Sequence, residues 1–249
     1  MKVSIITACF NSVETIETAI RSVMSQQYGE IEYIVVDGGS DDGTLDVIGK
    51  YREHIQTLVS GRDGGIYDAL NKGLGLATGE IVAFLHSDDC YADSRAIRCV
   101  VDAFMHKKTD CVYGDLQYVK RDDISVVVRK WTAGKYRHGM FLQGWMPPHP
   151  TFFSRLSCYR EYGGYDTSFR CSGDYELMLR FLHLRRLSVT YVPTVLVNMR
   201  SGGLSNATLT SRIRANREDR RAWAVNGLRP GALTFIRKPL SKLPQFLVR

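Results

Sequence analysis

An α/β fold with a mostly parallel central sheet flanked by helices is predicted by three features of this sequence. Short β-branched runs alternate with helix-like patterns over the first hundred residues, as in βαβ units. Acidic or glycine-rich turns follow several of these runs, where strands give way to loops. Hydrophobic residues make up 44% of the 249, enough for one large domain or two small ones, which excludes disorder as the main state.

The first half of the chain supplies the strands and helices of these units. Residues 3–8 are predicted as the first strand, and Asn11 with Glu14 three residues later indicates a capping box for a helix whose apolar face spans residues 16–24. The pattern then repeats. Further strands are predicted at 31–36, 56–60, 81–85 and 111–113, and further helices at 44–54, 65–77 and 94–105.

After residue 114 the regular alternation of strand and helix patterns ends, and the sequence indicates a mixture of antiparallel strands, loops and helices. The predictions there are an antiparallel hairpin at 116–120 and 125–131, a loop rich in Gly, Pro and aromatic residues at 134–150, helices at 155–162, 175–184 and 208–225, and a strand pair at 188–199. We therefore expect one nucleotide-binding half and one half that completes a cleft. In open parallel sheets that cleft lies at the carboxyl ends of the strands.

The net charge of +7 is concentrated in the C-terminal tail. Residues 212–249 hold ten basic and two acidic residues, a net of +8, which leaves −1 for residues 1–211. The neutral body argues against a nucleic acid as partner. For residues 234–249, which mix basic with apolar side chains, we expect contact with the anionic cytoplasmic leaflet of the inner membrane. For residues 212–221 the alternative is a solvated basic helix packed on the body.

Cysteine usage and the apolar runs indicate a soluble, cytoplasmic protein. The six cysteines include no C-x-x-C pair and no zinc-finger spacing, which fits a reducing compartment. The apolar run after Lys2 is only eight residues long, too short for a signal core, and the long uncharged stretch at 139–154 contains three prolines.

Acidic residues follow three of the predicted strands. Asp37 ends the second, Asp63 follows the third, and Asp88-Asp89 follow the strand at 81–85. Parallel strand ends meet at one edge, and adjacent carboxylates repel unless a cation lies beside them, so this pair indicates a hard divalent metal. The alternative is that Asp88-Asp89 cap the next helix.

Other segments permit both a structural and a functional interpretation. The turn at 37–43 matches neither the Rossmann nor the P-loop glycine pattern, so pyrophosphate binding by a glycine loop is not expected. Asp174 lies at a predicted helix start, where an acidic residue is commonly a cap or a dipole partner. The loop at 144–151, with Trp145, His149 and three prolines, is typical of a pocket wall, although a lone histidine is more often structural.

Taken in order, several segments resemble the inverting enzymes of glycosyltransferase family 2, which have the glycosyltransferase-A fold. The resemblance covers roughly residues 2–206. A late GGLS at 202–205 makes the sequence similar to bacterial enzymes of exopolysaccharide assembly, the colanic-acid type among them. The matching segments are VSIITACFN at 3–11, IVVDGGSDDGT at 34–44, DGGIYDALNKG at 63–73, ATGE at 77–80, FLHSDD at 84–89, PHPTFF at 148–153 and GDYELMLR at 173–180.

This resemblance implies a single glycosyltransferase-A, Rossmann-like catalytic domain at 1–206, with a nucleotide-binding half at 1–114 and an acceptor-binding half at 115–206. A basic helical extension follows at 207–249. The implied donor is a nucleoside-diphosphate-sugar, the implied acceptor a saccharide on a polyprenyl-type lipid, and the implied cofactor a divalent metal, Mg²⁺ or Mn²⁺. The pathway implied is bacterial cell-surface or exopolysaccharide biosynthesis, at the cytoplasmic face of the inner membrane.

The same resemblance assigns residue roles. Asp174 is the expected general base, and Asp89 the direct metal ligand with Asp88 at the ribose or behind the metal. Many members have a second Asp at Gly38 and an Asp at His86, so the base contact falls to other groups and the metal to Asp88 and Asp89. The expected nucleotide-sugar contacts are Thr7, Asp37, Asp63, Asp88, Arg200 and Ser205, and Trp145 and His149 are expected on the acceptor side.

The implied chemistry is a single displacement at the anomeric carbon. The metal stabilises the leaving diphosphate, and Asp174 takes the proton of the attacking hydroxyl, a contribution of typically ~10²–10⁴ in rate.

Two other functions stay open. The first is a nucleotidyltransferase that makes a nucleotide-sugar, although the place after the first strand reads CFNSV at 9–13 rather than a basic glycine loop. The second is a non-catalytic subunit of a polysaccharide assembly complex.

Overall fold

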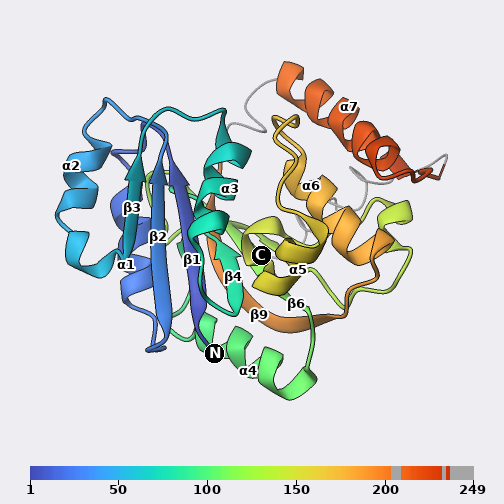
Figure 1. The fold of residues 1–249 in the computed structure, drawn as a ribbon, viewed down its shortest axis with the longest axis horizontal. Coiled ribbons are helices and arrows are strands. Elements are labelled where there is room, and N and C mark those ends of the chain that lie inside the picture. Colours follow the sequence, from blue (N-terminus) through green and yellow to red (C-terminus); the bar gives the residue numbers. More distant parts are fainter. Residues whose placement is uncertain (203–208, 232–233, 236–249) are drawn as a thin grey trace.

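The predicted α/β fold is confirmed by the computed structural model, which describes residues 1–202, 209–231 and 234–235 (Figure 1). The strands are β1 (Val3–Cys9), β2 (Ile31–Asp37), β3 (Thr57–Ser60), β4 (Ile81–Phe84), β5 (Cys90–Tyr91), β6 (Cys111–Val119), β7 (Val127–Trp131), β8 (Phe153–Arg155) and β9 (Val189–Arg200). The helices are α1 (Ile16–Met24), α2 (Thr44–Gly49), α3 (Ile66–Leu76), α4 (Ala96–Lys107), α5 (Leu156–Tyr162), α6 (Gly173–Met178) and α7 (Leu209–Val225). A π-helical turn at Leu179–Leu184 continues α6.

One sheet runs through both halves of the described chain, in the order β3-β2-β1-β4-β8-β6-β9-β5, with β7 paired to β6. Strands β3, β2, β1 and β4 are parallel, and β6 is parallel to β9, whereas β8 runs antiparallel to both of its neighbours. β5, from the first half, pairs with β9 from the second. The sheet therefore joins the two predicted halves into one body.

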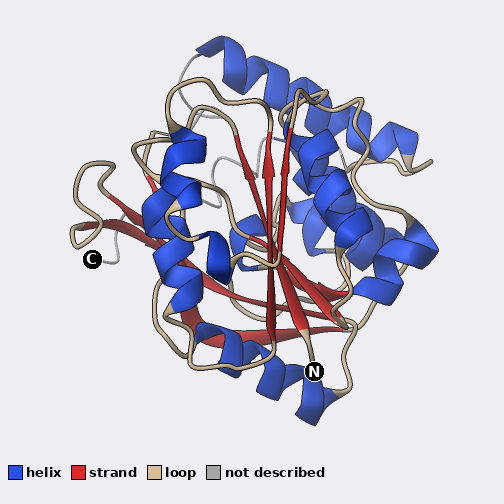
Figure 2. Cartoon of the chain, turned by 60° about the vertical axis from the view of Figure 1, so that its left-hand side comes forward, coloured by secondary structure: helices blue, strands red, loops and turns tan. Residues whose placement is uncertain are grey.

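Helices cover both faces of the sheet, as Figure 2 shows. On one face the apolar sides of α1, α2 and α4 pack in one buried cluster, and on the other α3, α5, α6 and α7 form a second. α7 belongs to this core because the Trp223 side chain is 1% exposed and its Nε1–H donates to the hydroxyl of Tyr175, 2.9 Å away. α7 is therefore packed on the body, as the alternative for residues 212–221 stated.

Three local predictions were wrong. The expected strand pair at 188–199 is the single strand β9, whose partners are β6 and β5, with shifts of register beside Gly114. Asn11 caps no helix: α1 begins at Ile16, and the Asn11 Oδ1 accepts from the backbone N–H of Asp41 at 3.1 Å. The helix expected at 44–54 ends at Gly49 and is followed by a 3₁₀ turn.

No helix within the described residues has both the length and the apolar character that a membrane span requires.

Candidate active site

The parallel strands bring their carboxyl ends to one edge of the sheet. Cys9, at the end of β1, is paired with Asp37, at the end of β2, and Asp37 is paired in turn with Ser60, at the end of β3. The loop after β4, which carries Asp88 and Asp89, leaves the sheet at the same edge, because β4 is parallel to β1. The acidic residues expected at this edge are thus brought together by the strand order.

Asp37 organises the turn that follows β2. Its buried carboxylate accepts from the backbone N–H groups of Gly39 and Ser40 at 3.1 Å and from the Ser60 hydroxyl at 2.7 Å. Burial alone would raise the pKa of Asp37, but hydrogen bonds from Ser40 and Ser60 outweigh it and lower the pKa. Asp37 is therefore charged and fixes the turn that follows β2. The residues of this turn at 39–42 lie closer to solvent than Asp37 itself.

Asp63 lies against this turn. Its Oδ1 accepts from the backbone N–H of Gly65 at 2.8 Å, just before α3. Its Oδ2 approaches Gly38 so closely that a Cβ at position 38 would lie 2.9 Å from it. Because Gly38 has no side chain, the carboxylate of Asp63, which follows β3, can approach the turn after β2.

The loop after β4 is held by Arg200, at the end of β9. The guanidinium donates to the backbone carbonyls of Asp88 at 2.8 Å and Arg121 at 3.0 Å and to the hydroxyl of Thr18 at 3.2 Å. The backbone N–H of Arg200 donates to Asp89 Oδ1 at 3.2 Å. Arg200 was expected to contact the nucleotide-sugar. The residue is only 7% exposed, and its guanidinium is bonded inward, so it supports this loop instead.

The two carboxylates of this loop differ sharply in burial. Asp89 is 1% exposed, its Oδ2 has no hydrogen-bond partner among the described residues, and burial followed by repulsion from Asp88 raises its pKa well above the usual value. Asp88 is only half-buried, and its carboxylate forms no hydrogen bond or ion pair within the described chain. The sequence suggested Asp89 as the direct metal ligand, and this stays a prediction; the greater exposure of Asp88 makes it the alternative ligand.

These residues fit a divalent cation. Two adjacent carboxylates, one of them with an enclosed oxygen that lacks a partner, carry negative charge that a cation beside Asp88 would offset. Oxygen donors suit Mg²⁺ and Mn²⁺. Among the described residues no three His, Cys, Asp or Glu side chains gather as metal ligands. Mg²⁺ is commonly bound by one or two carboxylates together with waters and phosphate oxygens of a substrate. The helix-cap alternative fails because α4 begins only at Ala96.

A second set of contacts joins the β4 loop to the loop predicted as a pocket wall. The His86 Nε2 lies 3.4 Å from His149 Nδ1, and the His149 Nε2 lies 2.9 Å from the hydroxyl of Tyr165. Burial, with a smaller effect of His86, lowers the pKa of His149 to about 3. His149 is thus neutral near pH 7 and links His86 to Tyr165 rather than carrying charge.

Asp174 lies half-buried in the first turn of α6, opposite α3. The hydroxyl of Tyr67, from α3, lies 3.5 Å from Asp174 Oδ1. A Cβ at Gly173 would lie 2.8 Å from the ring of Tyr67, so glycine there permits α3 and α6 to approach. The rings of Tyr67 and Tyr165 stack with centroids 5.4 Å apart. The series of side-chain contacts that starts at His86 and passes through Tyr165 therefore ends beside Asp174.

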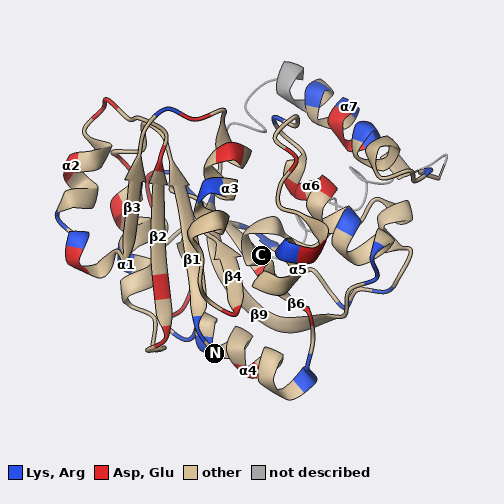
Figure 3. Ribbon diagram, viewed as in Figure 1, with Lys and Arg blue, Asp and Glu red and all other residues tan. Residues whose placement is uncertain are grey.

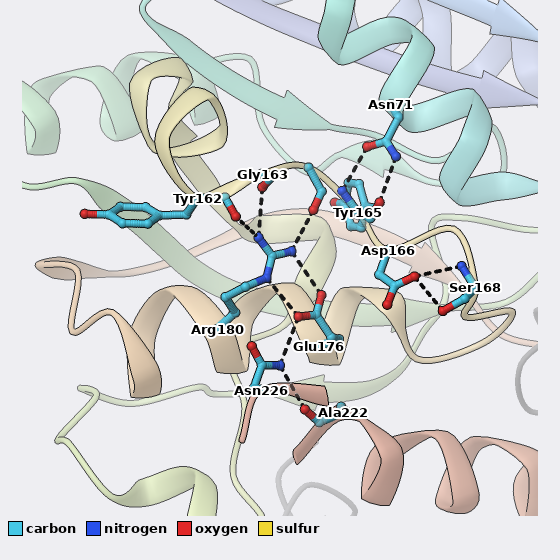
Figure 4. Close-up of polar contacts among 11 residues, drawn as sticks. Asn71, Tyr162, Gly163, Tyr165, Asp166, Ser168, Glu176, Arg180, Ala222 and Asn226 are labelled. Carbon is cyan, nitrogen blue, oxygen red and sulfur yellow. Dashed lines mark hydrogen bonds and ion pairs between the residues drawn. The ribbon is translucent and has the colours of Figure 1, made fainter. Parts of the chain in front are cut away.

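Figure 4 shows what fixes α6 in place. Arg180 forms a two-pronged ion pair with Glu176, with distances of 2.8 and 3.0 Å, and its guanidinium donates to three successive backbone carbonyls at 162–164. Asn71, on the same face of α3 as Tyr67, exchanges two hydrogen bonds of 2.8 Å with the backbone of Tyr165. The backbone at 162–165 is thus held by Asn71 of α3 on one side and by Arg180, in the turn that continues α6, on the other.

Two predicted site residues, Thr7 and Trp145, lie apart from this arrangement. Thr7 is fully buried in β1, and its hydroxyl accepts from that of Tyr33 at 3.1 Å, so its side chain belongs to the core. The Trp145 Nε1–H donates to the carbonyl of Ala133 at 2.9 Å, and its ring packs among aromatic residues. Ser205 lies outside the described residues.

Sequence reasoning overlooked Tyr67, Asn71 and Tyr165 as parts of the site. The signal for the first two was present: they stand four residues apart in the segment at 63–73, so they share one face of a helix. Nothing in the sequence indicated that this face would meet the segment before α6.

A mostly parallel sheet with acidic residues at the carboxyl ends of its strands is typical of α/β enzymes that bind nucleotides at that edge. The chain belongs to glycosyl transferase family 2, whose family model matches residues 4–161. It is 34% identical over 188 residues to an uncharacterized glycosyltransferase of Mycobacterium tuberculosis, covering 72% of this chain and 68% of that one. It is 30% identical over 213 residues to a PGL/p-HBAD biosynthesis glycosyltransferase of Mycobacterium bovis, covering 82% and 78%.

Solved structures show the same fold. TarS 1–349 of S. aureus in complex with UDP-GlcNAc matches with a TM-score of 0.71 and 18% identity, over 99% of this chain and 72% of that one. The mannosyltransferase PcManGT from Pyrobaculum calidifontis, in complex with GDP-Man and Mn²⁺, matches with a TM-score of 0.67 and 20% identity, over 99% and 69%. The glycosyltransferase-A fold expected from the sequence motifs is therefore confirmed.

Proposed function

We propose that this glycosyltransferase transfers a sugar, with inversion and with the help of a divalent cation, from a nucleoside-diphosphate-sugar to a hydroxyl of a lipid-linked saccharide. The observation that carries the proposal is the placement of Asp174. It lies in the first turn of α6, and its Oδ1 is 3.5 Å from the hydroxyl of Tyr67 on α3, the helix that follows the loop carrying Asp63. The site would thus contain carboxylates that hold the metal at the leaving diphosphate and a further carboxylate, that of Asp174, that takes the proton of the attacking hydroxyl.

The donor half of the site is residues 1–114. Asp63 and the turn held by Asp37 would contact the nucleoside, a role supported by their position at or just beyond the carboxyl ends of strands. Asp88 would hold a Mg²⁺ or Mn²⁺ ion together with phosphate oxygens, with Asp89 buried behind it and Arg200 fixing the loop. When bound, the cation supplies Lewis-acid stabilisation of the leaving diphosphate. The similarity to a fold neighbour captured with GDP-Man and Mn²⁺ supports this assignment.

The acceptor half is residues 115–206. Asp174 would accept the proton of the acceptor hydroxyl as that oxygen forms its bond to the anomeric carbon and the bond to the diphosphate breaks. His149 is a poor alternative base because burial keeps its pKa near 3. The loop with Trp145 and His149 borders the acceptor side. Attack opposite to the leaving diphosphate inverts the anomeric configuration.

The donor and the pathway are proposed from the relatives. UDP- and GDP-sugars are the first donors to test, because fold neighbours were captured with UDP-GlcNAc and GDP-Man. A role in bacterial cell-surface glycolipid or exopolysaccharide synthesis is supported by the resemblance of the sequence motifs to such enzymes and by the relative named for PGL/p-HBAD biosynthesis.

The segment at 234–249, for which membrane contact was expected, lies outside the described residues except for 234–235, and we propose a further membrane contact for the basic face of α7. The two acidic residues of this helix face inward: Glu218 bonds to backbone N–H groups of 170–172, and Asp219 is 6% exposed. Arg217 and Arg220 are exposed on the other side, and Figure 3 shows the basic positions along α7. Anionic lipids attract such faces by about 1 kcal/mol per basic residue. We expect co-sedimentation with phosphatidylglycerol vesicles that falls when both arginines are changed to glutamine; unchanged sedimentation would contradict this contact.

The central test is turnover of donor by the purified chain. We expect slow release of UDP or GDP from UDP-GlcNAc or GDP-Man when water replaces the acceptor, with Mn²⁺ or Mg²⁺ present and not with EDTA. Turnover of no nucleotide-sugar in a wider panel would favour a non-catalytic subunit, and equal turnover in EDTA would contradict the proposed metal dependence. The nucleotidyltransferase alternative is set aside by membership of the family.

A further inference from the structure

Glu218, on the inward face of α7, binds three successive backbone N–H groups. Its Oε2 accepts from Cys171 at 2.7 Å and from Ser172 at 2.9 Å, and its Oε1 accepts from Arg170 at 3.1 Å. Successive N–H groups that converge on one carboxylate form an anion-binding concavity, and hydrogen bonds to a charged acceptor are roughly twice as strong as neutral ones. The segment 170–172 is therefore fixed by a helix more than forty residues further along the chain.

This segment leads directly into α6. Ser172 is the residue before the helix, and Asp174 is in its first turn. The Ser172 hydroxyl also donates to the carbonyl of Ala215 on α7 at 3.2 Å. On the other side of Asp174, Tyr175 accepts from the Trp223 Nε1–H at 2.9 Å. α7 thus holds the backbone immediately before and the side chain immediately after Asp174.

These contacts complement those on the donor side. Tyr67 meets Asp174 from α3, and Gly173 permits the approach. Arg180 and Glu176 form an ion pair further along the helix, and the backbone N–H of Glu176 donates to the carbonyl of Ser172 at 3.0 Å. The direction of the Asp174 carboxylate is therefore set from one side by α3 and from the other by the Glu218 carboxylate. A shift of about 1 Å in a catalytic group can cost on the order of 10²-fold in rate.

We propose that Glu218 is a positioning residue for Asp174: it orders the segment 170–172 so that the Asp174 carboxylate faces the acceptor hydroxyl. This rests on the proposed function of Asp174 as the base. Glu218 touches no substrate in this proposal and acts only through the backbone that leads into α6.

The experiment compares Glu218→Gln with Glu53→Gln in the full chain; the Glu53 side chain is 83% exposed and takes the same substitution. Thermal unfolding first establishes that both variants fold. Hydrogen–deuterium exchange of the peptide covering 168–178 should quicken at least tenfold in Glu218→Gln and stay unchanged in Glu53→Gln. Release of UDP or GDP from whichever of UDP-GlcNAc and GDP-Man the wild type turns over with Mn²⁺ should fall at least tenfold in kcat in Glu218→Gln, with the donor KM changed less than twofold.

A double-mutant comparison separates positioning from general damage. Because Glu218 acts through Asp174, Glu218→Gln should lower the residual kcat less than twofold when Asp174 is already Asn. An equal loss in both backgrounds, unchanged exchange at 168–178, or a wild-type kcat in folded Glu218→Gln would overturn the proposal. If Asp174→Asn itself keeps wild-type turnover, the base assignment fails and the positioning proposal fails with it. A loss in Asp174→Asn without one in Glu218→Gln overturns the positioning proposal alone.

Discussion

Removal of the Arg180 guanidinium is expected to destabilise the protein more than any exposed ion pair would. Arg180→Met leaves the Glu176 carboxylate, 4% exposed, with one remaining donor within the described part of the chain, the side-chain amide of Asn226 at 3.0 Å. It also takes the guanidinium donors from three backbone carbonyls at 162–164. Breaking a buried ion pair from one side typically costs about 3 to 5 kcal/mol.

This magnitude can be measured against a matched control. A loss of about 3 to 5 kcal/mol in a chain of this length corresponds to a fall in Tm of roughly 6 to 20 °C. Arg21→Met breaks another pair at the same helical spacing, with Glu17, but there the side chains are 67% and 44% exposed, so little change is expected. Urea denaturation followed by tryptophan fluorescence gives both free energies of unfolding.

The double variant tests whether the ion pair is the cause. Glu176→Gln removes the charge that Arg180→Met leaves behind, so the double variant should be less destabilised than the sum of the two single ones. The reasoning is refuted if Arg180→Met loses no more stability than Arg21→Met, because the guanidinium would then contribute nothing beyond an exposed charge.

Three further predictions follow from the structure. Asp88→Asn should abolish the Mn²⁺-dependent part of UDP or GDP affinity in calorimetry, whereas Asp89→Asn should weaken it less because its carboxylate is enclosed; the reverse order would restore Asp89 as the ligand. Gly173→Ala should cost about 1 to 3 kcal/mol of unfolding free energy, because its Cβ would lie 2.8 Å from the Tyr67 ring; unchanged stability would refute that tight contact. Finally, burial would raise the pKa of Glu32, but hydrogen bonds from Lys2, Ser4 and Thr78 outweigh it and lower this pKa from 4.5 to about 2. The group therefore stabilises the fold by about 3 kcal/mol above pH ~4.5, and this gain is lost as pH falls toward 2. Glu32→Gln should remove that pH dependence of the unfolding free energy, and an acid titration identical to that of the wild type would contradict it.

The parallel half of the fold was predictable because its signals are local. Each strand from β1 to β4 is a short β-branched run, and α1, α3 and α4 carry apolar residues at helical spacing, so the pattern alone fixes their type. The acidic strand ends then followed from the geometry of parallel sheets. β5 and β8 were missed because two or three residues are too few to show a period. β9 was predicted as two strands; it is one strand whose pairing with β6 changes register beside Gly114, which no local pattern indicates.

The candidate site was predictable as a set of positions and less so as a set of roles. Asp37, Asp63 and Asp88 lie at the expected edge, but the inward bonds of Arg200 and the burial of Thr7 and Asp89 depend on tertiary packing. Glu218 could not be predicted at all, because its partners lie more than forty residues away and are backbone groups. A carboxylate that binds backbone N–H groups leaves no complementary residue type in the sequence.

The most direct test of the proposed chemistry is the kcat of Asp174→Asn for donor turnover, with nucleotide affinity measured on the same sample. Asparagine keeps the size of the side chain and its place in the first turn of α6 but cannot accept the proton. We predict unchanged Mn²⁺-dependent binding of UDP or GDP and a fall in kcat of at least about a hundredfold, within the range for general-base catalysis. Turnover close to that of the wild type, with binding intact, would contradict the assignment of Asp174 as the base.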